Sequence, residues 1–427
     1  MNVLFPIYHH LDRLLHKDRA DLLLVLALAL VTGLTTFYRA QLVNPILYTM
    51  QAIDVFFDGD VAPAFDTFTK LDADQSNKSV HALLPLFVNL LALPSRLLGL
   101  NDIVSARTII SGISAYTIGT FFVILRLLSY SRLDASLFSI LAATTAAAQF
   151  WFAVPEHYGL GAATMLSALC LVAVAMHHQV SLVWYLVVNL LTVGVTSTNS
   201  MAGITATIAT QSWHKAVRIF VMTLLLLAGL AIIQKIFFPT APLRAILGTG
   251  SQMDFVSFPP TDILARYQAF FLHSVVMPAI GTIKNWNSSS DWPYLMTVRH
   301  SLVGSGSVYA IAATAAWVAL LGLGTWAFFS IDRYPQLRLT LGLTLLGQFV
   351  LHTFHGQETF LYSLHYTLLL VMVASLVSLT RLRKVGIVLV VIAIVTVGIN
   401  NSLQFHSAME LVQQWKGQLP ENFPATR

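Results

Sequence analysis

The strongest constraint on this chain is a series of apolar segments that reach the length needed to cross a lipid bilayer. The sequence of 427 residues is 56% hydrophobic and only 10% charged. A crossing takes about 20 apolar residues, and backbone polar groups in lipid must be satisfied within the segment, which favours helices. The sequence therefore predicts an all-α polytopic membrane protein that forms a single transmembrane domain over residues 1–427.

The basic residues predict how the spans are oriented. They are dispersed between apolar runs. The net charge is +5, but the sequence has no block of Lys and Arg of the kind that binds nucleic acid. Residues 1–20 contain Arg13, Lys17 and Arg19, so the N-terminus is expected in the cytoplasm. Eleven spans are predicted, over residues 21–38, 103–125, 134–153, 159–176, 181–197, 201–212, 218–237, 304–329, 339–354, 360–380 and 385–401.

Residues 81–100 are apolar enough to cross, but Pro85 and Pro94 interrupt them, and proline removes a helical hydrogen bond. If this segment crossed, the basic loop 126–132 would become external, so the positive-inside rule favours a segment that lies in the interface. Two long polar segments then fall on the external side. They are a first loop with juxtamembrane helices, over about 40–102, and a later segment over about 238–303.

The first external loop carries the main candidates for chemistry. Residues 54–74 contain six aspartates: Asp54, Asp58, Asp60, Asp66, Asp72 and Asp74. The pairs at 58/60 and 72/74 could hold a divalent cation through oxygen ligands, or one carboxylate could act as a general base. The phenylalanines between the acids predict an amphipathic segment that lies against the membrane. A solvated loop is the alternative for each carboxylate taken alone.

Two further acidic motifs stand at the external mouths of predicted spans, at Glu156 and at Glu358. An ionisable residue at this depth is costly unless it is solvated or paired. The alternative is an acid in the first turn of a helix, where it complements the dipole. These motifs supply the following candidate substrate-binding residues: His157, Tyr158, His355, Glu358, Tyr362 and His365.

Three basic or titratable residues could serve a phosphorylated substrate. His81 closes the acidic loop and is either a ligand or proton donor there, or an interfacial histidine. Arg266 and His273 flank an aromatic stretch in the later external segment. Phosphate recognition favours Arg for its bidentate fork. No Cys/His ligand set demands a metal, so a divalent cation is permitted by the paired aspartates but is not required.

The motifs Asp58-Gly-Asp60, His81-Ala-Leu-Leu-Pro-Leu-Phe87, Pro155-Glu156 and Phe360-Leu-Tyr-Ser-Leu-His365 occur in a layout that resembles the GT-C class of membrane glycosyltransferases. That class includes protein O-mannosyltransferases and aminoarabinose transferases. The resemblance implies a GT-C-like fold in a bacterial inner membrane, with the active site on the periplasmic side. It also implies a polyprenyl-phosphate-linked sugar as donor, and a glycan, lipid or protein hydroxyl as acceptor.

By this resemblance Asp60 matches the first-loop carboxylate that deprotonates the acceptor in an inverting attack. Glu156 matches the second-loop acid that orients the acceptor or the base. Asp58 and Asp66 are the alternatives to Asp60 as the base. The chain departs from the pattern in one place. Three apolar residues separate His81 from Pro85, and the arginine expected before the histidine is absent.

Two other functions compete with the transferase. A transporter or flippase of lipid-linked envelope intermediates would place charges within the spans and often shows inverted repeats. Here the charges gather at one predicted face, which favours the enzyme. A non-catalytic scaffold is the third reading. In each case membrane lipid is an expected partner.

Overall fold

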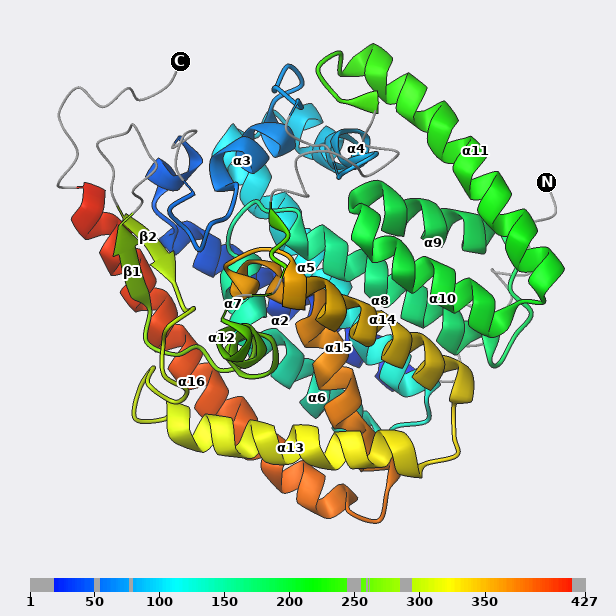
Figure 1. Cartoon of the computed structure of the whole chain (residues 1–427), viewed down its shortest axis with the longest axis vertical. Coiled ribbons are helices and arrows are strands. Elements are labelled where there is room, and N and C mark those ends of the chain that lie inside the picture. Colours follow the sequence, from blue (N-terminus) through cyan, green and yellow to red (C-terminus); the bar gives the residue numbers. More distant parts are fainter. Residues whose placement is uncertain are drawn as a thin grey trace.

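The computed structural model describes residues 19–49, 54–76, 80–243, 255–258, 260, 262–284 and 294–416, and it is a bundle of helices (Figure 1). Within these residues eight helical segments are long and apolar enough to cross a membrane. They are α2 (Arg19–Leu42), α5 (Asp102–Leu127), α8 (Tyr158–Ala175), α11 (Trp213–Phe237), α13 (Ala310–Ser330), α14 (Pro335–Phe354), Thr359–Leu379 and α16 (Arg383–Lys416). The protein is therefore an all-α polytopic membrane protein. The predicted cytoplasmic N-terminus rests on Arg13 and Lys17, which lie outside the described residues.

Three of the eleven predicted spans form shorter helices. Residues 134–153 divide into α6 (Arg132–Thr144) and α7 (Ala146–Trp151), whereas residues 181–197 and 201–212 form α9 (Leu182–Val195) and α10 (Ser200–Thr210). The division falls at Thr145, whose hydroxyl accepts a hydrogen bond from the Ala148 amide at 3.3 Å and so caps α7. The count of eleven spans is thus not reproduced among the described helices.

Helix α4 (Leu84–Leu97) lies within the ambiguous segment 81–100, and both of its ends lie at one end of the bundle. The Leu83 amide donates to the Gly194 carbonyl at the end of α9, at 2.7 Å. The Ser95 hydroxyl lies 2.5 Å from that of Ser105, in the first turn of α5. Helix α4 therefore joins two helix ends without running the length of the bundle, as expected of a segment that does not cross.

The innermost span is Thr359–Leu379, which comprises η6 (Thr359–Tyr362), α15 (Ser363–Ser375) and η7 (Leu376–Leu379). Of its most apolar window, 94% is buried, compared with 11% for α2. Figure 1 shows α15 in the middle of the bundle, with α11, α13 and α16 at the periphery. Close approach needs small residues: a Cβ at Gly324 of α13 would lie 2.4 Å from the Ala374 Cα.

The two ends of the bundle differ in their side chains. One end, which we call the basic end, contains Arg126, Arg132 and Arg383 in ion pairs with Asp21 and Asp134. The opposite end, which we call the site end, contains α3 (Val61–Thr69), α4 and α12 (Ile263–Gln268). It also holds a hairpin of β1 (Gly281–Lys284) and β2 (Tyr294–Thr297), paired antiparallel with Gly281 opposite Thr297. The later segment 238–303 therefore contains helix and hairpin as well as loops.

Candidate active site

The acidic loop at residues 54–60 is fixed on a base of buried aromatic rings. Phe57 packs edge-on against Phe150 and Phe360, with ring centroids 5.7 and 5.1 Å apart. A Cβ on Gly59 would lie 3.1 Å from the Trp151 ring, so a glycine fits this tight turn. Phe57 and Asp58 both have positive φ, at 54° and 63°, a costly conformation for residues with side chains. The aromatic packing holds that strained turn in place.

The prediction that the phenylalanines of this loop lie against the membrane is wrong. Phe56, Phe57, Phe65 and Phe68 are all buried inside the protein, with at most 7% of each residue exposed. Phe65 stacks on Tyr48 with ring centroids 4.7 Å apart. An alternation of acids and aromatics arises equally from a loop that covers a protein core, because the apolar partner can be protein instead of lipid.

Asp58 and Asp60 form a coupled carboxylate pair at the mouth of this turn. The Asp58 side chain reaches solvent, yet protein atoms surround it on most sides. This surrounding protein and, to a lesser extent, the charge of Asp60 raise the pKa of Asp58 to about 6. Asp60 immediately precedes α3 and is partly buried. The pair therefore offers a carboxylate that can accept a proton near neutral pH.

Glu156 and two histidines meet beside the pair, at the starts of α8 and α4. Glu156 is 1% exposed, and its Oε2 lies 3.1 Å from the His157 amide and 3.0 Å from His157 Nδ1. The His157 ring lies 4.1 Å from that of His81. A ring nitrogen of His81 is 2.6 Å from the Val195 carbonyl, so α9 fixes the position of the histidine that leads into α4.

Two tyrosines connect these groups. The rings of Tyr158 and Tyr362 lie 6.0 Å apart. The carboxylates of Asp58, Asp60 and Glu156 are close enough to act electrostatically on both phenols, and Arg266 acts on that of Tyr362. The charged residues expected at the active site are thus brought together from the first loop, α8 and α12, although almost one hundred residues separate Asp60 from Glu156.

Arg266 is held under the loop that follows α14. It is buried, and its Nη1 lies 3.4 Å from the His352 carbonyl and 3.3 Å from the His355 carbonyl. Burial, followed by the charge of Arg266, lowers the pKa of His355. Gly356 has φ +72°, and a Cβ there would lie 2.7 Å from the Tyr362 ring, so glycine lets the loop pass close to this phenol.

Glu358 ties this loop to the hairpin. Its Oε2 accepts a hydrogen bond from the Thr297 hydroxyl at 2.5 Å, and the nearby amides of Val298 and Phe360 favour its ionised form. Within the described part of the chain its Oε1 is buried and has no hydrogen-bond partner. Burial raises the pKa of Glu358 to about 7, and the charge of Asp58 acts in the same direction.

The remaining predicted residues lie around or away from this cluster. His365 is buried, 5.5 Å from the Tyr158 ring, and fits because Gly161 has no Cβ. His273 lies in the π-helix η5 (Ala269–His273), where burial lowers its pKa to about 4. Asp66 is in a different environment, since it pairs with Lys70 at 2.7 Å along α3.

The second aspartate pair, at residues 72 and 74, is exposed, and Asp74 instead binds the Ser76 amide and hydroxyl, each at 2.9 Å. Over the ranges that the structure describes, no three His, Cys, Asp or Glu side chains are grouped as a metal site would require. A divalent cation at the cluster would therefore depend on Asp58 and Asp60 as its protein ligands.

Sequence reasoning missed a buried polar chain behind the cluster. A ring nitrogen of His352 lies 3.1 Å from the Gln348 Oε1, and Gln348 Nε2 lies 3.5 Å from the Asn199 Oδ1. All three residues are at most 2% exposed. The available signal was the spacing of Gln348 and His352, four residues apart on one face of an otherwise apolar helix.

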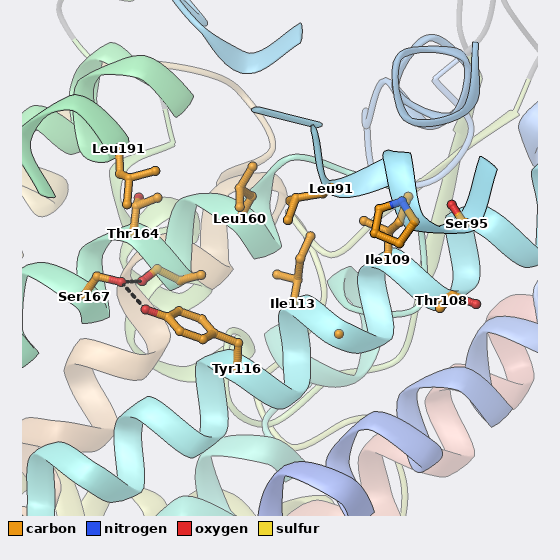
Figure 2. A pocket seen from close by; sticks show the side chains of 13 residues that line it. Leu91, Ser95, Thr108, Ile109, Ile113, Tyr116, Leu160, Thr164, Ser167 and Leu191 are labelled. Carbon is orange, nitrogen blue, oxygen red and sulfur yellow. Dashed lines mark hydrogen bonds between the residues drawn. The ribbon is translucent and has the colours of Figure 1, made fainter. Parts of the chain in front are cut away.

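An apolar groove lies between α4, α5, α8 and α9, with a volume of about 540 Å³ (Figure 2). Its polar members are few and include Ser95, Thr108, Tyr116 and Ser167. The contact between His81 and His157 brings the starts of α4 and α8 together, and both helices go on to line the groove. The cluster and the groove thus share two helices.

Comparison with protein-family models, curated proteins and solved structures found no match to this chain. The argument about function therefore depends on the geometry of the cluster and the groove.

Proposed function

We propose that this protein is a GT-C-type glycosyltransferase that moves a sugar from a polyprenyl-phosphate donor to an acceptor hydroxyl at the site end. The observation that carries the proposal is the meeting of Asp58, Asp60, Glu156 and Arg266 around the buried Tyr158 and the partly buried Tyr362, next to an apolar groove. Carboxylates for proton transfer, a guanidinium for phosphate and a lipid-accessible groove are the parts that such a reaction needs.

In the proposed reaction the acceptor oxygen attacks the anomeric carbon and the bond from that carbon to the phosphate oxygen breaks. The carboxylate pair takes the acceptor proton, and Asp60 is our choice for the base. Asp58 holds a pKa of about 6 beside it, so the pair is poised near the working pH that favours general base catalysis. Glu156 and His157 position the acceptor. A single displacement of this kind inverts the anomeric configuration.

Arg266 is our choice for the group that stabilises the departing phosphate. Arg266 is buried, its charge acts on the Tyr362 phenol, and its Nη1 lies 3.3 Å from the His355 carbonyl. A preorganised cation in a site that excludes water stabilises developing negative charge more strongly than one in water. No metal is required for this step, although the aspartate pair permits one.

The basic end supports a particular orientation in the membrane. Short loops rich in Arg are retained on the cytoplasmic side, and Arg126, Arg132 and Arg383 gather at the end opposite the cluster. We therefore propose that the cluster faces away from the cytoplasm, on the periplasmic side of a bacterial inner membrane. The acceptor would be a glycan, lipid or protein hydroxyl delivered from that side.

The test is transfer of sugar by Asp60→Asn, measured with the purified protein in lipid nanodiscs and a lipid-phosphate-linked sugar. We expect a loss of about 100-fold to 10,000-fold, the usual contribution of a general base. The matched control is Asp72→Asn, an exposed aspartate of the same loop, which should keep full activity. Full activity in Asp60→Asn would reject the base assignment.

The transporter hypothesis is separated by a second measurement. Wild-type protein in sealed vesicles should form a glycosidic bond without moving the lipid-linked sugar between leaflets. Movement between leaflets with no bond formed would reject the transferase and support a flippase.

A further inference from the structure

One end of the groove is bridged by Tyr116 of α5 and Ser167 of α8. Their hydroxyl oxygens are hydrogen-bonded at 2.8 Å, and Ser167 also donates to the Ala163 carbonyl at 2.8 Å. Figure 2 shows the two side chains meeting across the groove. Of the groove-lining residues on their helices, these two lie farthest from the site end. The hydrogen bond therefore bridges α5 and α8 where the groove stops.

The dimensions fit part of one hydrocarbon chain. Along α5 the lining runs from Thr108 to Tyr116, about 12 Å at 1.5 Å per residue. At Gly112, between them, a Cβ would meet nothing within 4 Å. Tyr116 is 54% exposed and Leu91 43% exposed on the surface around the groove. The groove is thus continuous with the lipid-facing surface, and the occupant we infer for it is an apolar chain already in the membrane.

We propose that the Tyr116–Ser167 bridge limits how much of the donor's prenyl chain the groove holds, and so sets the protein's preference for chain length. This inference rests on the proposed function, since it takes the occupant to be the chain of the lipid-phosphate donor. The first part of the chain lies along Gly112, and the remainder turns out into the bilayer at Tyr116. Tyr116 and Ser167 are specificity-determining residues with no part in the chemistry.

The physical consequence is a plateau in affinity. Because the chain is already in the membrane, a methylene that enters the groove exchanges contacts with lipid for closer van der Waals contacts with the groove wall, and each such exchange strengthens binding by a modest factor. Methylenes beyond Tyr116 stay in the bilayer when the donor binds, so they add nothing to the affinity. Affinity should therefore rise with chain length until the groove is full and then stay constant.

The test measures binding of geranyl, farnesyl, geranylgeranyl and undecaprenyl phosphate to the intact protein by native mass spectrometry. Gly112→Leu fills the groove, so the plateau should begin at a shorter chain. Tyr116→Ala removes the end of the groove, so the plateau should begin at a longer chain. The matched control is Gly322→Leu on α13, where a Cβ also meets nothing within 4 Å. It should reproduce the wild-type series.

Identical series in all four proteins would overturn the inference, as would displacement of every prenyl phosphate by ordinary phospholipid at equal concentration. Binding is measured without turnover, so the two proposals fail separately. Shifted plateaus in a protein that transfers no sugar would support the groove and reject the enzyme. Unshifted plateaus in an active enzyme would reject only the proposal that the groove sets the preference for chain length.

Discussion

At the basic end Asp21 lies between Arg126 and Arg132, with N–O distances of 2.7 and 2.6 Å. At the site end the charge that most affects Asp58 is another carboxylate, Asp60. The same contrast holds for the buried acids. Asp134 pairs with Arg383 at 2.8 Å. Glu358 instead accepts a hydrogen bond from the neutral Thr297 hydroxyl, and none of the groups that act on its pKa is a cation.

The comparison separates two uses of charge. Opposite charges at the basic end connect α2, α5, α6 and α16, so they contribute to holding the helices together. At the site end, Asp58 and Glu358 are kept where their ionised form is disfavoured, which leaves them ready to bind or move a proton. Strongly shifted pKa values therefore mark the end at which the chemistry should occur.

Among substitutions that compare the two ends, we expect the largest effect from Arg266→Gln. Removal of the cation that stabilises the departing phosphate should lower kcat by about 100-fold to 1,000-fold. Arg266→Lys keeps the charge but loses the planar fork, so it should restore part of the activity. The matched change at the basic end, Arg383→Gln, should leave kcat unchanged. Equal losses in Arg266→Gln and Arg383→Gln would remove the distinction between the two ends.

Glu358→Gln should stabilise the protein, and only at neutral or alkaline pH. The pKa of Glu358 is about 7 in the folded protein, against an ordinary value of 4.5. Unfolded chain loses this proton near pH 4.5 and folded protein near pH 7, so stability falls as pH rises through that window. The cost is fully present above pH 7, where the substitution should recover up to about 3 kcal/mol.

Thermal unfolding at one scan rate, at pH 4 and pH 8, measures this difference. Glu410→Gln, at an exposed site on α16, is the control and should change neither value. A Glu358→Gln protein that gains equally at both pH values would show that the carboxyl does not titrate as the structure indicates.

Length and hydropathy made the long spans predictable, because a helix in lipid has to satisfy its own backbone wherever it lies. The break at Thr145 was not predictable. The amides of Ala146 and Ala147 donate to the carbonyls of Val275 and Ser274, at 3.0 and 2.9 Å. These partners are more than a hundred residues away in the sequence, and only the tertiary structure brings them to the break.

The candidate site, like the fold, was predictable from the sequence only in part. Rarity of charge in an apolar chain drew attention to the six aspartates of residues 54–74 and to Glu156, and only the resemblance to the glycosyltransferase class narrowed the aspartates to Asp60, with Asp58 and Asp66 as alternatives. Asp66 could not be separated from them by sequence, because its partner Lys70 becomes adjacent only once α3 forms. Gln348 and Asn199 are uncharged, so composition gave no reason to select them.

The pH dependence of transfer gives a smaller, tenfold effect. If the pair must be ionised to accept the proton, activity should fall as pH decreases through the pKa of Asp58, about 6. At pH 5 kcat/KM should be about a tenth of its plateau. The Asp72→Asn protein should give the same profile. A plateau that continues unchanged down to pH 4 would exclude a base with a raised pKa.

The smallest effect we expect is at the basic end, from Asp134→Asn. Asp134 is 2% exposed, but its partner Arg383 remains partly solvated when the pair is broken. The hydrogen bond from the Ser131 hydroxyl can persist with an amide, so the loss should be about 1 kcal/mol. The thermal midpoint should fall by roughly 1 °C with kcat unchanged. Asp332→Asn, exposed at the same end, should have no effect. A large loss of activity in Asp134→Asn would mean that the basic end takes part in the reaction, and that its ion pairs do more than hold helices together.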